Sequence, residues 1–263
     1  MYDFAYLKPA SLAAAVAALG AEDAKAMSGG MTLIPVLKQR LNKPSVVVDL
    51  SGLGMSGIQV TGDAVVIGAM TTHATVAASA EVKRAIPALA ALAGLIGDKE
   101  VRRRGTIGGS LANNDPAADY PAAALALGAT ITTNKRAIKA DDYFQGMFAT
   151  ALETGEVVTS VSFPVPAKAG YSKFKNPASR YAMVGVFVAK GPAGTRVAIT
   201  GAGQSGVFRH AACEAALAAN WSAGALNGVA TSAANLNSDI HASAEYRAHL
   251  CGVVARRAVA AAG

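Results

Sequence analysis

Two glycine pairs, each flanked by hydroxyl side chains, are the segments of this 263-residue chain best suited to chemistry. The first is SGGMT at 28–32, and the second is TIGGS at 106–110. Glycine removes the side chain that would keep a ligand away from backbone amides, and such amides favour an anion. Each pair alone is a weak signal, because tight turns use glycine without any ligand. Together the pairs are candidates for binding a phosphate-bearing ligand.

A third glycine cluster, GAGQSG at 201–206, matches the GxGxxG pattern of dinucleotide-binding turns. That pattern requires an acidic residue about 20 positions further on to hold the ribose. The segment NWSAGALNG occupies that region instead, and no second strand-like run follows it. We therefore interpret GAGQSG as a strand-to-helix turn without a bound nucleotide.

Other reactive side chains are isolated in the sequence. His73, in TTHATV, has no identifiable nucleophile or acid as a partner, and we expect it to be a helix cap or a surface residue. Cys213 and Cys251 match no CxxC spacing, and two thiols cannot hold a four-thiolate iron–sulfur or zinc site alone. We therefore predict no catalytic side chain and no metal site in this chain.

The elements that must position the glycine pairs follow from periodicity and capping residues. The first fifty residues predict a strand, helix, strand, helix and strand, at 4–7, 12–20, 24–27, 33–41 and 46–50. This order places the first glycine pair between a strand and a helix. After residue 57 the pattern changes to short strands, with a hairpin at 57–70, a long helix at 82–96 and strands at 129–133 and 157–165.

The last third of the chain follows PVPAKAG at 164–170, which is typical of a linker. Strands are expected first, turning at GPAG, and then helices at 210–220 and 243–262, the second capped by Ser243. The chain is thus predicted to be α+β, with units at 1–57, 58–168 and 169–263.

Composition narrows the functional class. The chain is 52% hydrophobic and only 6% aromatic, which is typical of a globular protein. Its net charge of +7 raises the question of nucleic acid, but basic residues are scattered apart from Arg102–Arg104, so an anionic small ligand or an acidic partner is the better interpretation. No signal-like start and no run of eighteen uncharged apolar residues is present, so we expect no membrane span and a cytoplasmic location.

The segments SGGMTLIP and RRRGTIGGSLANNDPAADYPAA, in this order and at this separation, resemble the FAD-binding medium subunit of the molybdenum hydroxylases. This family includes carbon monoxide dehydrogenase medium chains and the flavin domain of xanthine dehydrogenase. The resemblance covers nearly the whole chain, including SAEYRAHL near its end. It implies a two-lobed FAD-binding domain of the paired-loop, vanillyl-alcohol-oxidase-like type, followed by a small α+β C-terminal domain.

The resemblance also implies residue roles. The two loops would hold the FAD pyrophosphate between them, Asp119 would accept hydrogen bonds from sugar hydroxyls, and Tyr171 would cover one face of the isoalloxazine ring. FAD would be noncovalent, since neither cysteine falls in a loop and no histidine neighbours the glycine pairs in sequence. The residues assigned to the cofactor are Ser28, Gly29, Gly30, Met31, Thr32, Leu33, Ile96, Thr106, Ile107, Gly108, Gly109, Ser110, Asp119, Val158, Tyr171 and Lys175.

The function implied by the resemblance is electron transfer within a complex. A molybdopterin-binding large subunit would oxidise the substrate, and a small subunit would pass electrons through [2Fe-2S] clusters to FAD in this chain. The complex would be a dimer of heterotrimers, in the cytoplasm or at the inner face of the membrane. A freestanding FAD-dependent oxidase and a non-enzymatic interaction module remain alternatives, and the sequence identifies neither the substrate nor the terminal electron acceptor.

Overall fold

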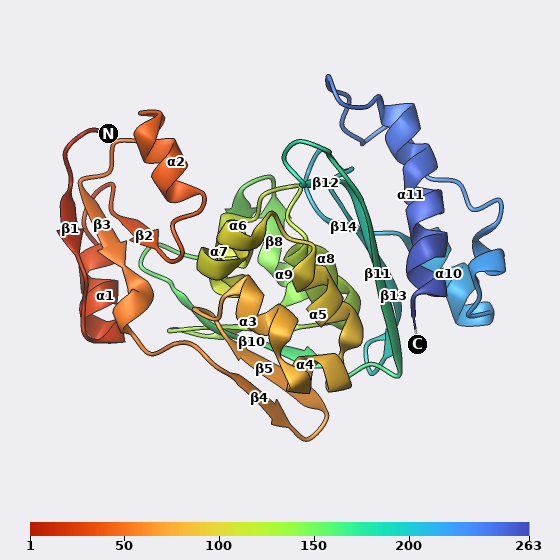
Figure 1. Ribbon diagram of the computed structural model, residues 1–263, viewed down its shortest axis with the longest axis horizontal. Coiled ribbons are helices and arrows are strands. Elements are labelled where there is room, and N and C mark those ends of the chain that lie inside the picture. Colours follow the sequence, from red (N-terminus) through yellow and green to blue (C-terminus); the bar gives the residue numbers. More distant parts are fainter. Residues whose placement is uncertain (263) are drawn as a thin grey trace.

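The computed structural model describes residues 1–262 and arranges them in three lobes along one axis. The N-terminal and C-terminal lobes lie at opposite ends, and the middle lobe lies between them (Figure 1). Among the described residues, no helix has both the length and the hydrophobicity needed to cross a membrane. The mixed α and β content agrees with the predicted fold class.

The N-terminal lobe has a three-stranded parallel sheet in the order β1-β3-β2. Its elements are β1 (Ala5–Leu7), α1 (Leu12–Leu19), β2 (Lys25–Met27), α2 (Leu33–Lys38), β3 (Val46–Asp49) and the short 3-10 helix η1 (Leu50–Gly52). The predicted β-α-β-α-β order is confirmed, and the Ser11 hydroxyl caps α1 by accepting from the Ala14 amide. The first glycine pair therefore leaves the carboxyl end of β2 and enters α2.

The middle lobe is built on a five-stranded antiparallel sheet in the order β4-β5-β10-β6-β7. Gly62 adopts a φ of +60° in the tight turn between the first two strands, which confirms the predicted hairpin. The strands of this lobe are β4 (Ile58–Thr61), β5 (Ala64–Gly68), β6 (Thr130–Thr133), β7 (Ala137–Lys139) and β10 (Val158–Pro164), with a separate small hairpin of β8 (Phe144–Gly146) and β9 (Ala149–Thr150).

The predicted long helix at 82–96 is wrong: two helices occupy this segment. Pro87 begins the second helix and disfavours helical backbone at Ile86, whose ψ is 73°. The helices of the middle lobe are α3 (His73–Ala78), α4 (Ala80–Ala85), α5 (Pro87–Gly94), α6 (Lys99–Arg104), α7 (Ile107–Asn113), α8 (Tyr120–Leu127) and α9 (Ala140–Tyr143).

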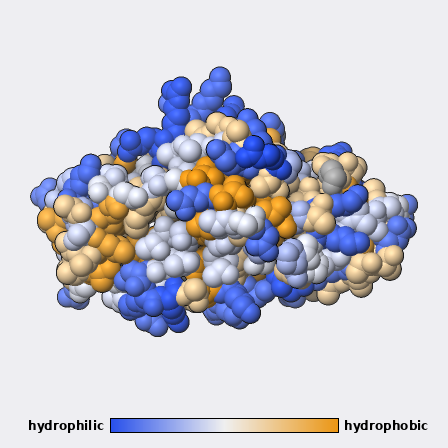
Figure 2. Space-filling model, turned by 90° about the horizontal axis from the view of Figure 1, so that it is seen from below, coloured by the Kyte–Doolittle hydropathy of each residue, from blue (hydrophilic) through white to orange (hydrophobic). Residues whose placement is uncertain are grey.

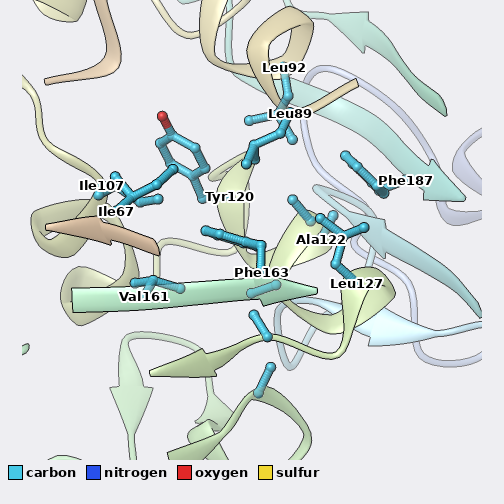
Figure 3. Packing of buried hydrophobic residues seen from close by; sticks show 14 of the residues in the cluster. Ile67, Leu89, Leu92, Ile107, Tyr120, Ala122, Leu127, Val161, Phe163 and Phe187 are labelled. Carbon is cyan, nitrogen blue, oxygen red and sulfur yellow. The ribbon is translucent and has the colours of Figure 1, made fainter. Parts of the chain in front are cut away.

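The core of the middle lobe lies between these helices and the sheet. Leu89 and Leu92 of α5 and Tyr120 of α8 are completely buried and face Phe163 of β10, with Phe187 of the C-terminal lobe nearby (Figure 3). A packed core of this kind holds α7 and its glycines in one position.

The C-terminal lobe contains a four-stranded antiparallel sheet and two main helices. The predicted linker at 164–170 is partly strand, because β11 already begins at Lys168. The interpretation of GAGQSG as a strand-to-helix turn also needs correction, because this turn connects two antiparallel strands, β13 and β14, before the helix. The elements are β11 (Lys168–Lys175), β12 (Ala182–Gly191), β13 (Gly194–Thr200), β14 (Phe208–Arg209), α10 (Ala211–Ala219), η2 (Ala223–Leu226) and α11 (Ala244–Ala260).

Strand β12 is buried on both of its faces. Val184, Val186 and Val188 pack in a core with residues of α10 and α11, while Phe187 and Ala189 belong to the core of the middle lobe. Because side chains alternate along a strand, one strand contributes to both cores. The C-terminal lobe is therefore packed firmly against the middle lobe.

Candidate functional site

The two glycine loops lie against each other, although 78 positions separate Ser28 from Thr106. The Ser28 and Thr106 hydroxyl oxygens are 2.6 Å apart. A Cβ added to Gly29 would overlap the carbonyl oxygen of Arg104. Glycine is therefore required at position 29 for the approach of the loops, independently of any ligand.

A short chain of hydroxyl groups links the loops. The Gly109 amide donates to Thr106 Oγ1 at 3.1 Å, so this hydroxyl caps α7. Ser28 Oγ donates to Met70 Sδ at 3.0 Å, which leaves Thr106 as the donor to Ser28 because each hydroxyl has one hydrogen. Removing either hydroxyl would loosen both loops.

The loops differ in the backbone donors that they offer. The amides of Gly29, Gly30 and Met31 donate to no acceptor within residues 1–262. The Gly108 amide, in contrast, donates to the Ala69 carbonyl at 2.9 Å, and the Gly109 amide bonds to its cap. The expectation that both glycine pairs offer backbone amides to an anion is therefore wrong for the second pair.

The second glycine pair serves close packing and leaves space, and it supplies no free donor. A Cβ on Gly108 would lie 2.5 Å from Ala69 Cβ, so this glycine is needed for packing. A Cβ on Gly109 would meet Thr106 Oγ1 at 3.0 Å and Ser28 Cβ at 3.4 Å, in the gap between the loops. The first loop thus supplies unbonded amides. Gly109 has no side chain and therefore leaves space for a ligand between the two loops.

A cavity of about 720 Å³ opens where the N-terminal and middle lobes meet. This size is typical of small-molecule sites, which span about 300–1,000 Å³. All the predicted cofactor residues line it except Ile107, which is buried in the core, and Tyr171 and Lys175. The structure therefore brings together residues from both glycine loops with Ile96, Asp119 and Val158.

Asp119 is a buried residue of the cavity lining, and two side chains of β11 hold it. The Tyr171 hydroxyl donates to its carboxylate, and Lys173 Nζ lies 3.0 Å from it. Burial raises the pKa of the Asp119 carboxyl, and the Lys173 ammonium and the Tyr171 hydroxyl oppose that rise. Tyr171 therefore supports Asp119 and lies outside the cavity wall.

Lys173, rather than Lys175, is the lysine that reaches this site. Its side chain is only 2% exposed, whereas Lys175 lies exposed at the end of β11. A break in the register between β11 and β12 falls between Phe174 and Lys175. Alternation along the sequence gives both lysines the same face, so this irregularity could not be found from the sequence.

Two exposed aromatic side chains line the cavity and were missed by the sequence analysis. Tyr181 is 47% exposed, and Phe148 is 58% exposed on the β8–β9 hairpin. Asn114, with a left-handed φ of 44°, holds this hairpin by donating to the carbonyls of Gly146 and Ala149. Tyr181, unlike Tyr171, is placed where an aromatic ring can cover a ligand.

His73 is buried, which corrects the expectation of a cap or surface residue. It is the first residue of α3, and Thr72 caps that helix. The His73 backbone amide donates to the Gly105 carbonyl at 2.9 Å, and the side chain lines the cavity. Burial, with a smaller contribution from the Arg102 guanidinium, lowers the pKa of His73 to about 4. A neutral imidazole therefore lies beside the second glycine loop at neutral pH.

The other segments singled out in the sequence lie away from this cavity. In GAGQSG, Gly201 adopts a φ of +82°, and a Cβ there would overlap the Ala182 carbonyl, so this glycine is needed for the fold. Cys213 and Cys251 are buried in the C-terminal core, where burial raises their pKa values to about 11 and about 12. These thiols are protonated at neutral pH.

The cavity thus combines unbonded amides of the first glycine loop, the side-chain-free surface of Gly109 and two exposed aromatic side chains, which suits a ligand that carries phosphate and a ring system. A model of the FAD-binding domain in molybdopterin dehydrogenases matches residues 2–166. A model of the C-terminal domain of the CO dehydrogenase flavoprotein matches residues 169–262. The chain belongs to the family of FAD-binding medium subunits of the molybdenum hydroxylases.

Relatives match the chain over nearly its full length. It is 35% identical to the nicotine 6-hydroxylase medium subunit of Paenarthrobacter nicotinovorans, with 98% of this chain and 96% of that protein covered. It is also 35% identical to the carbon monoxide dehydrogenase medium chain of Afipia carboxidovorans, with 97% and 95% covered.

Solved structures show the same architecture. A chain of CO dehydrogenase from Oligotropha carboxidovorans matches with a TM-score of 0.90 and 34% identity, covering 98% of this chain and 97% of that chain. Quinoline 2-oxidoreductase from Pseudomonas putida 86 matches with a TM-score of 0.87 and 28% identity, covering 98% and 96%.

Proposed function

We propose that this chain is the electron-transfer subunit of a molybdenum hydroxylase complex. FAD held in the cavity receives electrons from the [2Fe-2S] clusters of a small subunit and delivers them to a terminal acceptor. A molybdopterin-binding large subunit oxidises the substrate. The observation that carries this proposal is the cavity between two loops, in a chain that matches medium subunits over nearly its whole length.

The residues of the cavity fit FAD. The free amides of Gly29, Gly30 and Met31 would donate to the diphosphate. Gly109 has no side chain, so it would leave space for the diphosphate between the loops. Asp119 would accept from sugar hydroxyls, which strengthens binding because hydrogen bonds to charged groups are worth more than neutral ones. Bound FAD supplies the redox chemistry, so the protein residues bind and orient it.

Tyr181 would cover the isoalloxazine ring, in place of Tyr171. Its half-exposed ring lines the cavity, whereas the Tyr171 hydroxyl is already bonded to Asp119. Lys173 would hold that carboxylate in position and oppose the rise in its pKa that burial causes. Tyr181→Ala should change the absorption spectrum or the affinity of bound flavin more than Tyr171→Phe does.

FAD is proposed to be noncovalent. Both cysteines are buried in the C-terminal core and cannot reach the cofactor. His73 lines the cavity, although it is far from the glycine pairs in sequence, and it is therefore the histidine at which a covalent link would be tested. Acid precipitation of the purified protein should release all of the flavin into the supernatant. Flavin that stays in a washed pellet would show a covalent link and contradict this part of the proposal.

The partners are proposed to be a molybdopterin-binding large subunit and a [2Fe-2S] small subunit, assembled as a dimer of heterotrimers in the cytoplasm or at the inner face of the membrane. Polar residues cover much of the face in Figure 2, but apolar side chains are exposed at its centre. Separately from that view, Met147 and Phe148 at the turn of the β8–β9 hairpin are each 58% exposed, as residues of a protein interface would be.

We also propose that the chain divides into an N-terminal FAD subdomain at 1–57, a second FAD subdomain at 58–168 and a C-terminal domain at 169–263.

The deciding experiment compares the chain alone with the chain expressed beside its neighbouring genes. Alone, it should bind FAD and oxidise no organic substrate. Co-expressed, it should purify with two further subunits and with absorption from iron–sulfur clusters. Substrate-dependent flavin reduction by the isolated chain would instead favour a freestanding oxidase, and absence of flavin binding would favour an interaction module.

A further inference from the structure

We infer that His73 is a cofactor-binding residue, whose Nε2–H donates a hydrogen bond to the FAD diphosphate at the junction of the two glycine loops. This inference rests on the proposed occupation of the cavity by FAD.

The imidazole of His73 lies against the second glycine loop. A Cβ on Gly105 would lie 2.5 Å from His73 Nε2, so this edge of the imidazole lies against the start of the second loop. Gly105 Cα would in turn lie 3.0 Å from a Cβ on Gly29, in the first loop. The Nε2 edge thus lies against Gly105, which packs on Gly29, and the Gly29 amide donates to no acceptor within residues 1–262.

The tautomer follows from the surroundings of the ring. Nδ1 is buried and has no hydrogen-bond partner within residues 1–262, whereas His73 also lines the cavity. An unpaired buried N–H is rarer in proteins than an unpaired buried acceptor. The single proton of the neutral ring is therefore favoured on Nε2, at the cavity edge, where it can be donated.

The groups around the ring keep it fixed and neutral. Tyr120 packs on it with ring centroids 5.4 Å apart and planes at 48°. Besides burial, the Arg102 guanidinium, on α6, lowers the pKa of His73. It is fixed because it donates to the carbonyls of Ile96 and Gly97. A fixed neutral donor suits a diphosphate, because little freedom is lost when the bond forms.

Three substitutions of His73 separate this role from simple packing. His73→Gln puts an amide N–H near the position of Nε2, His73→Asn puts one near Nδ1, and His73→Leu offers neither. His249→Leu, at an exposed position in the C-terminal helix, is the matched control. FAD dissociation constants are measured by flavin fluorescence with apoprotein at pH 7.5, and folding is checked by circular dichroism.

His73→Leu and His73→Asn should weaken FAD binding on the order of 10- to 150-fold, the range for a hydrogen bond to a charged group. His73→Gln and His249→Leu should stay within about threefold of the unmodified protein. Unchanged affinity of a folded His73→Leu protein, or equal losses for Gln and Asn, would overturn the inference. Failure of the unmodified protein to bind FAD would instead refute the proposed function itself.

Discussion

Gly109→Ala tests the paired-loop site at a glycine whose replacement should have little effect on folding. The new Cβ would lie 3.0 Å from Thr106 Oγ1 and 3.4 Å from Ser28 Cβ, which is tight but within reach of a small adjustment. Alanine in a helix gains about 0.8–1 kcal/mol over glycine, which offsets much of the cost of crowding. The stability of the apoprotein should therefore change by less than about 1 kcal/mol.

The effect on FAD should be much larger. The methyl group projects into the gap between the loops, so the diphosphate has to move away from the amides of Gly29 and Gly30. Each hydrogen bond to a charged group is worth about 1.5–3 kcal/mol, which corresponds to roughly 10- to 150-fold in affinity. Loss of one such bond predicts an FAD dissociation constant raised at least about 10-fold, and Gly109→Val should raise it further.

The assay is titration of apoprotein with FAD by flavin fluorescence, accompanied by thermal unfolding without FAD. Ser232→Ala, in an exposed turn of the C-terminal lobe, serves as the control. A Gly109→Ala protein with unchanged unfolding and unchanged FAD affinity would refute the reasoning, because TIGGS would then be a turn without contact to the cofactor.

Three further outcomes are expected. Gly29→Ala should lower the free energy of unfolding even without FAD, because its Cβ would overlap the Arg104 carbonyl; an apoprotein as stable as the unmodified one in urea would contradict this. Lys173→Met should cost about 3–5 kcal/mol by leaving the buried Asp119 carboxylate unpaired, while the exposed Lys175→Met should cost little, and equal urea midpoints for the two would disprove the assignment. The folded-state pKa of His73 lies below its unfolded value of 6.5, so its contribution to stability is present above pH 6.5 and is lost as pH falls toward 4, by about 3 kcal/mol. His73→Leu should lack this part of the acid destabilisation, as measured by urea unfolding at pH 7 and pH 4, and parallel losses in both proteins would exclude it.

The sequence by itself determined the local features of the site. The β-α-β-α-β order and the glycine pairs depend on short-range capping, periodicity and backbone freedom, so they could be found without a structure. The break at Pro87 was also local and could have been recognised from the proline.

The tertiary structure alone decided which of these groups are free to bind. Gly108 looks like a donor in the sequence, but its amide is taken by the Ala69 carbonyl. Lys173 replaces Lys175 because the strand pairing shifts after Phe174, and His73 is buried because α3 packs beside a loop that begins thirty residues later. Each outcome depends on contacts between segments distant in the chain, and such contacts leave no local periodicity to recognise.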